Sequence, residues 1–223
     1  DEDTRINVKL KSGQETEINA PGPKVTQDQF QALLTQIKNT TNKDTVIVAG
    51  SVPNSIPSDA YAQIAEITKN TGAKLVVDAE KDLVETVLPY QPLFIKPNKD
   101  ELEVMFNTTV SSDQDVVKYG KEILKKGAQS VIISLGGDGA VYVDEQQSIK
   151  AVNPQGKVIN TVGSGDSTVA GMVAGLESGL SIQDAFKQAV ASGTATAFEE
   201  DLATRDAIEK IKSQVTVSVL DGE

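Results

Sequence analysis

Short apolar runs alternate with longer amphipathic segments between residues 45 and 135. Strands buried on both faces of a sheet have this kind of continuous apolar run, and helices have apolar residues every three or four positions. The apolar runs are Val46–Ala49, Lys74–Val77, Leu93–Ile95 and Val131–Ile133. The amphipathic segments are Ser58–Asn70, Lys99–Phe106 and Asp113–Lys126. The alternation predicts an α/β fold with a mostly parallel central sheet and helices on both of its faces.

The first twenty residues follow a different pattern, in which apolar and polar residues alternate. Ile6–Leu10 and Thr16–Asn19 lie on either side of a turn at Ser12–Gly13, which predicts a hairpin with one polar face. A helix is then expected over residues 27–38. Toward the carboxyl end we expect strands at 140–143, 148–152 and 215–219 and helices at 166–177, 182–198 and 204–212.

The composition is that of an ordinary globular protein of 223 residues, 39% hydrophobic and 24% charged. No apolar run approaches the roughly 20 residues that a membrane span requires, and Asp1–Arg5 do not resemble a signal peptide. We therefore expect a cytoplasmic protein with no membrane partner. The formal net charge of −11 argues against a nucleic-acid partner, because a surface that binds phosphate backbones is normally basic.

The chain contains neither cysteine nor histidine. Without cysteine it has no disulfide, no thiolate metal site and no cysteine nucleophile. Without histidine it lacks the commonest general base near neutral pH. Any catalytic base must therefore be Asp, Glu, Lys or Tyr.

A loop of small residues runs into a helix between Asn160 and Val173. Two glycines, Gly163 and Gly165, flank Ser164, so that backbone N–H groups can converge on an anion at the positive end of the helix dipole. Asp166 follows directly. From this loop alone, Asp166 is as readily explained as a helix N-cap as by a catalytic role.

A second segment, Lys96–Leu102, joins a buried strand to a helix. Asn98 and Glu101 have the spacing of a capping box, which is a purely local explanation. The functional interpretation is that Lys96 and Asn98 contact phosphate oxygens while Glu101 holds Mg²⁺ through water, since magnesium keeps several of its waters. The two interpretations are compatible.

The third segment is glycine-rich and follows a buried strand, where ligands of open α/β sheets bind. A plain turn explains it equally well. It is not a Walker A loop, because the terminal Lys-Ser/Thr is missing. Its residues are Ser134, Leu135, Gly136, Gly137, Asp138 and Gly139.

In their order and type the three segments resemble the ribokinase or PfkB family of carbohydrate kinases. Residues 160–173 match the family's carboxyl-terminal signature at every constrained position. Asn98-x-x-Glu101 fits its N-x-x-E motif, and Ser134–Gly139 fits its ATP-contacting loop. The resemblance covers essentially the whole chain and implies a ribokinase-like core over residues 21–223, with residues 1–20 as part of a small β lid.

The resemblance also implies roles for these residues in an ATP-dependent kinase. Asp166 would take the proton of the acceptor hydroxyl, and the backbone N–H groups of Gly163, Ser164 and Gly165 would form an anion hole for the transferred phosphoryl group. ATP and Mg²⁺ are the implied cofactors. The resemblance is compatible with a monovalent cation near Asn160 and Val162, and it places the adenine contacts around Ala191–Thr196.

Within the family, the hairpin and Ala49–Pro53 resemble members that convert fructose 1-phosphate to fructose 1,6-bisphosphate. Arg5 would then hold the phosphate of the substrate, bidentately where geometry allows; the alternative is a solvated charge at a lid edge. Kinases of tagatose 6-phosphate or fructose 6-phosphate share most of these motifs, and a non-catalytic nucleotide- or sugar-binding module is a further alternative. Family lids often meet across a homodimer, which the hairpin permits.

One departure from the family pattern concerns the beginning of the chain. The family's early Asp and its Gly-Gly-x-Gly-x-Asn segment, which bind the sugar, have no counterpart here, and the first residue is not Met. We therefore expect the chain to lack the N-terminal sugar-binding portion of the family.

Overall fold

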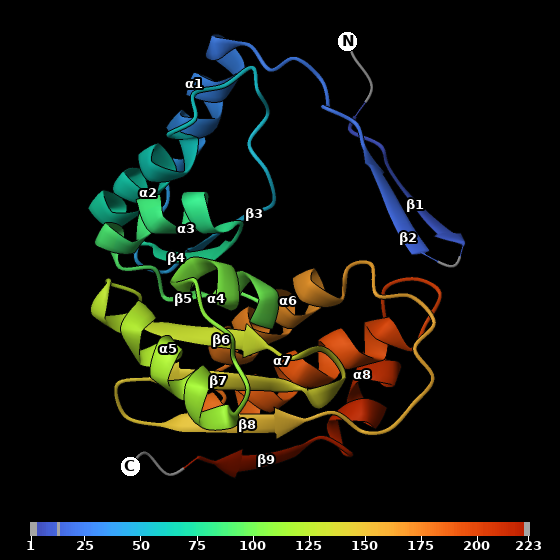
Figure 1. The fold of residues 1–223 in the computed structure, drawn as a ribbon. Coiled ribbons are helices and arrows are strands. Elements are labelled where there is room, and N and C mark those ends of the chain that lie inside the picture. Colours follow the sequence, from blue (N-terminus) through green and yellow to red (C-terminus); the bar gives the residue numbers. More distant parts are fainter. Residues whose placement is uncertain (1–3, 13, 221–223) are drawn as a thin grey trace.

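A computed structural model of the chain describes residues 4–12 and 14–220. Its core is a seven-stranded sheet in the order β3-β4-β5-β6-β7-β8-β9, and a separate two-stranded sheet, β1-β2, lies outside it (Figure 1). Residues 1–3 and Gly13, which belong to the predicted lid and its turn, lie outside the described residues, as do residues 221–223.

The elements agree with the predicted alternation, with small shifts at their ends. The strands are β1 (Asn7–Ser12), β2 (Gln14–Asn19), β3 (Thr45–Ala49), β4 (Lys74–Asp78), β5 (Phe94–Ile95), β6 (Ser130–Ser134), β7 (Ala140–Asp144), β8 (Ser148–Val152) and β9 (Thr216–Val219). The helices are α1 (Gln27–Ile37), α2 (Ala60–Thr71), α3 (Lys81–Val87), α4 (Lys99–Phe106), α5 (Asp113–Lys125), α6 (Ser164–Glu177), α7 (Ile182–Ala197) and α8 (Arg205–Lys212).

The sheet is parallel on one side and antiparallel on the other. Strands β3, β4, β5 and β6 pair in parallel, and β7, β8 and β9 extend the sheet with antiparallel pairs. The predicted α/β class, with parallel strands between crossover helices, is confirmed. The antiparallel pairing of β7 and β8 follows from short connections, because β6 to β7 and β7 to β8 are joined by a few residues without a crossover α-helix. Strand β9 pairs with β8 after the helices α6, α7 and α8.

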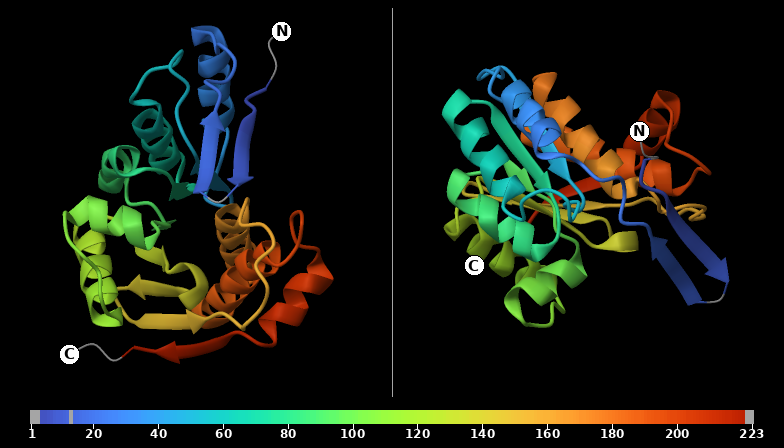
Figure 2. Two further views of the ribbon diagram at one scale, coloured as in Figure 1. Left: turned by 45° about the vertical axis from the view of Figure 1, so that its right-hand side comes forward. Right: turned by 90° about the horizontal axis from the view of Figure 1, so that it is seen from above.

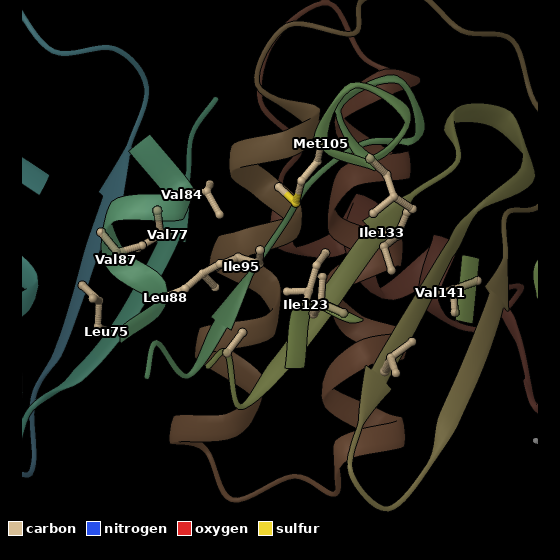
Figure 3. Packing of buried hydrophobic residues seen from close by; sticks show 14 of the residues in the cluster. Leu75, Val77, Val84, Val87, Leu88, Ile95, Met105, Ile123, Ile133 and Val141 are labelled. Carbon is tan, nitrogen blue, oxygen red and sulfur yellow. The ribbon is translucent and has the colours of Figure 1, made fainter. Parts of the chain in front are cut away.

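Two hydrophobic cores form because successive strand residues point to opposite faces of the sheet. On one face, Val77, Ile95 and Ile133 pack against α2, α3, α4 and α5 (Figure 3). On the other face, Phe94 and Ile132 pack against α6, α7 and the segment that follows α8. Each of these five side chains is fully buried, and each contributes about 1.5–3 kcal/mol by leaving water. Both faces are covered, as the continuous apolar runs predicted.

Two helix starts differ from the sequence predictions. Helix α6 begins at Ser164, two residues earlier than predicted, with Gly163 as its N-cap. Asp166 is therefore not the N-cap that its position suggested but the third residue of the helix. Helix α3 was not predicted, because its seven residues are too few for a helical period to be recognised.

The β1-β2 hairpin projects away from the rest of the molecule (Figure 2). Val8 pairs with Ile18 across the two strands, and these residues share one face with Ile6 and Leu10. All four side chains are exposed, between 43% and 63%. Asn7 and Asn19 pair on the opposite face. The hairpin thus has the predicted polar face, and its other face is an uncovered apolar surface.

None of the helices in the described residues is both long enough and apolar enough to cross a membrane.

Candidate active site

The polar residues that follow three neighbouring parallel strands come together at one edge of the sheet. Asp78 ends β4, Lys96 follows β5, and Ser134 ends β6. Ser134 and Asn98 form an isolated parallel bridge, and Ser134 N donates to Pro97 O at 3.0 Å. The carboxyl edge of a parallel sheet is where ligands of such folds bind, so the topology creates a candidate site from residues far apart in the sequence.

Asp78 and Lys96 form a largely buried ion pair at this edge. Lys96 Nζ lies 3.2 Å from Asp78 Oδ2, and the two side chains are only 8% and 18% exposed. Burial raises the pKa of the Asp78 carboxyl, the charge and hydrogen bond of Lys96 oppose that rise, and the charge of Asp166 adds to it. The Asp166 carboxylate is therefore near enough to the ion pair for its charge to affect Asp78.

The N-terminus of α6 lies against the same ion pair. A Cβ atom on Gly165 would lie 3.3 Å from Lys96 Nζ, so the absence of a side chain there lets the ammonium group approach the first turn of the helix. Gly163, with φ of 78°, turns the chain into this helix. The first turn thus brings a lysine, a carboxylate and backbone N–H groups together.

Three backbone N–H groups at this helix start have no acceptor among the residues that the structure describes. They belong to Gly163, Gly165 and Asp166. Ser164 N, in contrast, donates to Thr161 O at 3.2 Å, and Ser164 Oγ is buried without a hydrogen-bond partner in the described chain. The unpaired donors at the positive end of the helix make the site suited to an anion.

The predicted capping box at α4 is present. Asn98 Oδ1 accepts from Glu101 N, and Glu101 Oε2 accepts from Asn98 N, both at 2.8 Å. Glu101 lines a separate hollow of about 360 Å³ whose other acidic residues are Glu80, Asp82 and Asp100. Asn98 lines both this hollow and the larger cavity described next. Across the described part of the chain, no group of three or more acidic side chains is arranged to hold a metal ion by itself.

A cavity of about 540 Å³ opens between the glycine-rich turn and helix α7. Eight of the residues predicted to bind ATP or phosphate line it: Lys96, Asn98, Ser134, Gly136, Gly137, Gly139, Ser164 and Gly165. Six predicted residues do not: Arg5, Glu101, Leu135, Asp138, Gly163 and Asp166. Leu135 packs toward the hydrophobic core instead, and Asp138 is exposed.

Arg5, predicted to hold a substrate phosphate, is not among the residues that line this cavity. Its Nη1 donates to Ser51 Oγ at 2.5 Å. Ser51 belongs to the segment that follows β3, which is the next parallel strand beside β4. The segment that leads into the β1-β2 hairpin and the carboxyl edge of the sheet therefore meet through these two residues.

The segment after β3 is also tied to the ion pair. Gly50 N donates to the backbone oxygen of Asp78 at 3.0 Å, and Tyr61 Oη donates to Gly50 O at 2.7 Å. Burial, followed by the charge of Asp78, raises the pKa of Tyr61 to about 12. Tyr61 therefore stays protonated and acts here as a donor.

Close packing against α7 holds α6 in place. A Cβ on Gly171 would lie 2.6 Å from Ser192 Oγ and 2.9 Å from Ala189 Cα. A Cβ on Gly193 would collide with Thr168 Oγ1 and lie 2.9 Å from Ser164 O, in the first turn that carries the site. Ser167 and Thr196 also share a hydrogen bond of 2.9 Å between the helices.

Asp78 and Asn153, which also belong to this region, were not predicted from the sequence. Asp78 ends a buried strand, and that position at a parallel sheet edge is a signal that could have identified it. Asn153 lines the cavity, but nothing in the letters Val152-Asn153-Pro154 distinguishes it from a turn residue. Its contacts lie 17 and 41 residues away in the chain.

Comparison with known proteins identifies related chains over almost the whole length. The profile of the family described as "pfkB family carbohydrate kinase" matches residues 1–208. A 1-phosphofructokinase of Bacillus subtilis is 42% identical over 98% of this chain and 72% of its own length. A D-tagatose-1-phosphate kinase of Bacillus licheniformis is 34% identical over 97% of this chain and 72% of its own.

Solved structures share the fold. A Staphylococcus aureus protein provisionally described as a phosphofructokinase is 81% identical, with a TM-score of 0.91 over 100% of this chain and 73% of its own. Escherichia coli phosphofructokinase-2, crystallised in complex with potassium, is 28% identical, with a TM-score of 0.85 over 94% of this chain and 70% of its own.

The buried ion pair predicts a change in the pH dependence of stability. Lys96→Met removes the charge that lowers the pKa of Asp78, so the folded-state pKa rises further above the ordinary value of about 3.9. The folded state then binds more protons than the unfolded state. The free energy of unfolding should fall as the pH rises from about 4, more steeply than in the wild type. Thermal unfolding measured between about pH 4 and 8 tests this.

The matched control is Lys96→Met/Asp78→Asn, which removes both charges. Its unfolding temperature should lose the added pH dependence, because the group that titrates is gone. Equal pH slopes for Lys96→Met and the wild type would contradict the proposed compensation.

Proposed function

This chain belongs to the pfkB family of carbohydrate kinases and is a sugar-phosphate kinase, and we propose that it transfers the γ-phosphoryl group of ATP to fructose 1-phosphate, yielding fructose 1,6-bisphosphate. The membership confirms the family, the ribokinase-like fold and the enzyme class predicted from the motifs. The choice of fructose 1-phosphate is supported by the 42% identity to a 1-phosphofructokinase. The sequence identity to a tagatose-1-phosphate kinase makes a tagatose phosphate the second candidate.

The observation that carries the proposal is the first turn of α6. It combines three unpaired N–H groups, of Gly163, Gly165 and Asp166, with the ammonium group of Lys96 and the carboxylate of Asp166. Phosphoryl transfer requires that the negative charge on the transferred group be stabilised and that the attacking hydroxyl lose its proton. Both kinds of group occur within one helical turn.

In the proposed reaction the Asp166 carboxylate takes the proton from the C6 hydroxyl of fructose 1-phosphate. The hydroxyl oxygen forms a bond to the γ-phosphorus, and the bond from that phosphorus to the bridging oxygen breaks, releasing ADP. The predicted anion hole changes in one respect. Because Ser164 N already donates to Thr161 O, the available donors are Gly163, Gly165 and Asp166, and Asp166 contributes its backbone as well as its side chain.

We propose that ATP occupies the cavity of about 540 Å³, whose size lies in the usual range of roughly 300–1,000 Å³ for such ligands. Lys96 and Asn98 at one end would contact phosphates, and Gly193 and Thr194 line the wall where the adenine contacts were predicted. The roles of Leu135 and Asp138 remain predictions that would involve backbone groups only.

Mg²⁺ fits the site only with help from the substrate. Glu101 uses Oε2 in the capping box, which leaves its second oxygen for a metal-bound water, and the phosphates of ATP would supply direct ligands. Bound there, the ion would neutralise charge on the phosphates. A monovalent cation near Asn160 and Val162 stays a proposal, which the potassium complex of Escherichia coli phosphofructokinase-2 supports.

We propose that Arg5 and Ser51 hold the phosphate of the sugar substrate. They come from the lid and from the sheet edge, and a phosphate bound between them would join the two. A guanidinium group can donate two parallel hydrogen bonds to a phosphate, and the Ser51 hydroxyl adds a third. In the absence of substrate the two side chains bond to each other, which keeps Arg5 near the position that it would use.

Asp166→Asn tests the base. The variant keeps the size of the side chain and the backbone N–H but cannot take a proton, so kcat should fall about 10²- to 10⁴-fold while KM for ATP changes little. A coupled ADP-release assay measures both constants. Asp206→Asn is a matched control, because Asp206 also lies in the first turn of a helix but belongs to α8. Near-wild-type turnover of Asp166→Asn would rule out the assignment.

Arg5→Ala tests the phosphate site and the choice of sugar. Loss of charge-assisted hydrogen bonds should raise KM for fructose 1-phosphate by roughly 10- to 100-fold, with KM for ATP unchanged. Arg205→Ala, which changes the other arginine of the chain, should leave both constants unchanged.

For the wild type, kcat/KM should be highest for fructose 1-phosphate among fructose 1-phosphate, fructose 6-phosphate, tagatose 1-phosphate and tagatose 6-phosphate. Faster turnover of a tagatose phosphate would favour the second candidate.

We also propose that two copies of the chain associate through the lid. The apolar face formed by Ile6, Val8, Leu10 and Ile18 is exposed on a two-stranded sheet that is barely stable alone. The same face of a second lid would cover it and would remove these side chains from water.

Val8→Glu/Ile18→Glu places two charges at the centre of this apolar face. Sedimentation velocity should show a dimer for the wild type and a monomer for the variant, because the charges would be buried at the interface. Asn7→Glu, on the opposite face, should remain dimeric. A monomeric wild type, or a dimeric double variant, would show that the lids do not form the interface.

A further inference from the structure

We propose that Asn153 is a positioning residue that holds the glycine-rich turn at a fixed distance from helix α7 and so sets the width of the nucleotide cavity. The proposal rests on the proposed function, in which that cavity binds ATP. Asn153 directly follows β8, and its side chain reaches both walls of the cavity, the turn Gly136–Asp138 on one side and Thr194 of α7 on the other.

The side-chain amide of Asn153 matches its two neighbours chemically. Its Nδ2 donates to the backbone oxygen of Gly136 at 3.0 Å, and its Oδ1 accepts from Thr194 Oγ1 at 2.9 Å. Only a side chain with a donor and an acceptor on one planar group can do both, so aspartate, which only accepts when ionised, cannot replace it. The pair of bonds also fixes the orientation of the amide.

Thr194 is a rigid support for this bond. It is 6% exposed, and its hydroxyl oxygen lies 2.8 Å from Val190 O, one turn earlier in the same helix. The single hydroxyl hydrogen of Thr194 therefore lies within reach of two acceptors, Val190 O in the helix and Asn153 Oδ1 outside it. The contact with Asn153 is the one that links α7 to the segment after β8.

The other hydrogen bonds that hold the glycine-rich turn in its conformation are made within its own backbone. Leu135 N donates to Gly139 O at 2.8 Å, and Asp138 N and Gly139 N make two further bonds within the turn at 3.2 Å. A Cβ on Gly139 would collide with Ala151 O, so the turn is pressed against β8 just before Asn153. Asn153 extends this contact from the base of the turn to Gly136.

Kinetics of the intact enzyme test the proposal. Asn153→Asp keeps the size and the acceptor for Thr194 but places a carboxylate oxygen opposite Gly136 O. Asn153→Asp and Asn153→Ala should each raise KM for ATP about tenfold, with KM for the sugar phosphate within about twofold of wild type. Thr194→Val should act in the same direction, and Thr194→Ser, which keeps the hydroxyl, should raise KM for ATP less than Thr194→Val does.

Asn153→Ala/Thr194→Val should have a KM for ATP no higher than Asn153→Ala alone, because the two residues act as one unit. Hydrogen exchange without nucleotide should be faster at residues 135–140 in the Asn153 variants. Thr68→Val is the matched control, since Thr68 is also buried and its hydroxyl bonds only within its own helix; it should change neither quantity.

Two results would overturn the proposal. One is an unchanged KM for ATP in variants whose melting temperature falls, which would make Asn153 a structural residue only. The other is unaltered hydrogen exchange at residues 135–140. If calorimetry shows no ATP binding by the wild type, the proposed function itself fails, and the positioning role fails with it. ATP binding by the wild type with unchanged variants overturns only the role of Asn153.

Discussion

The close approach of α6 and α7 is the constraint on which the rest of the site depends. Gly171 and Gly193 let the two helices touch through backbone and small side chains, where a methyl group on either would meet atoms at less than 3 Å. Gly193 faces Ser164 O, in the turn that offers the unpaired N–H groups. The first turn of α6 therefore contacts α7 at Gly193 as well as Lys96 at Gly165. The same small residues that allow α6 and α7 to pack closely therefore also position the first turn of α6.

In the proposed function, this packing positions Asp166 to act as the base in a chain without histidine. Asp166 lies in the first turn of α6, near enough to the Asp78–Lys96 pair for its charge to affect Asp78. Lys96 offsets the charge of Asp78, and the absence of a side chain on Gly165 lets the ammonium group approach this turn. Removing the lysine would leave two negative charges beside the place where the phosphoryl group is proposed to bind.

The features that could be predicted from the sequence are those whose causes are local. Asn98 and Glu101 are three residues apart, and both hydrogen bonds of their capping box are present as expected. The strand and helix alternation likewise follows from periodicity within each segment. Asp78 and Asn153 were missed because their partners lie on other strands and helices. The antiparallel pairing of β7 and β8 depends on connection length, and the start of α6 at Ser164 depends on backbone conformation. A pattern of apolar residues records neither.

The buried pairing of Lys96 with Asp78 has a consequence for how ligands reach the site. Lys96 is the cation that lies against the first turn of α6, and its charge is balanced before any ligand arrives, in a protein whose formal net charge is −11. The positive electrostatic potential around the cavity is therefore too weak to attract an anion from a distance, because charges are screened over about 8 Å at physiological salt. In the proposed function, phosphorylated ligands would be selected at contact, by the directions of fixed N–H groups.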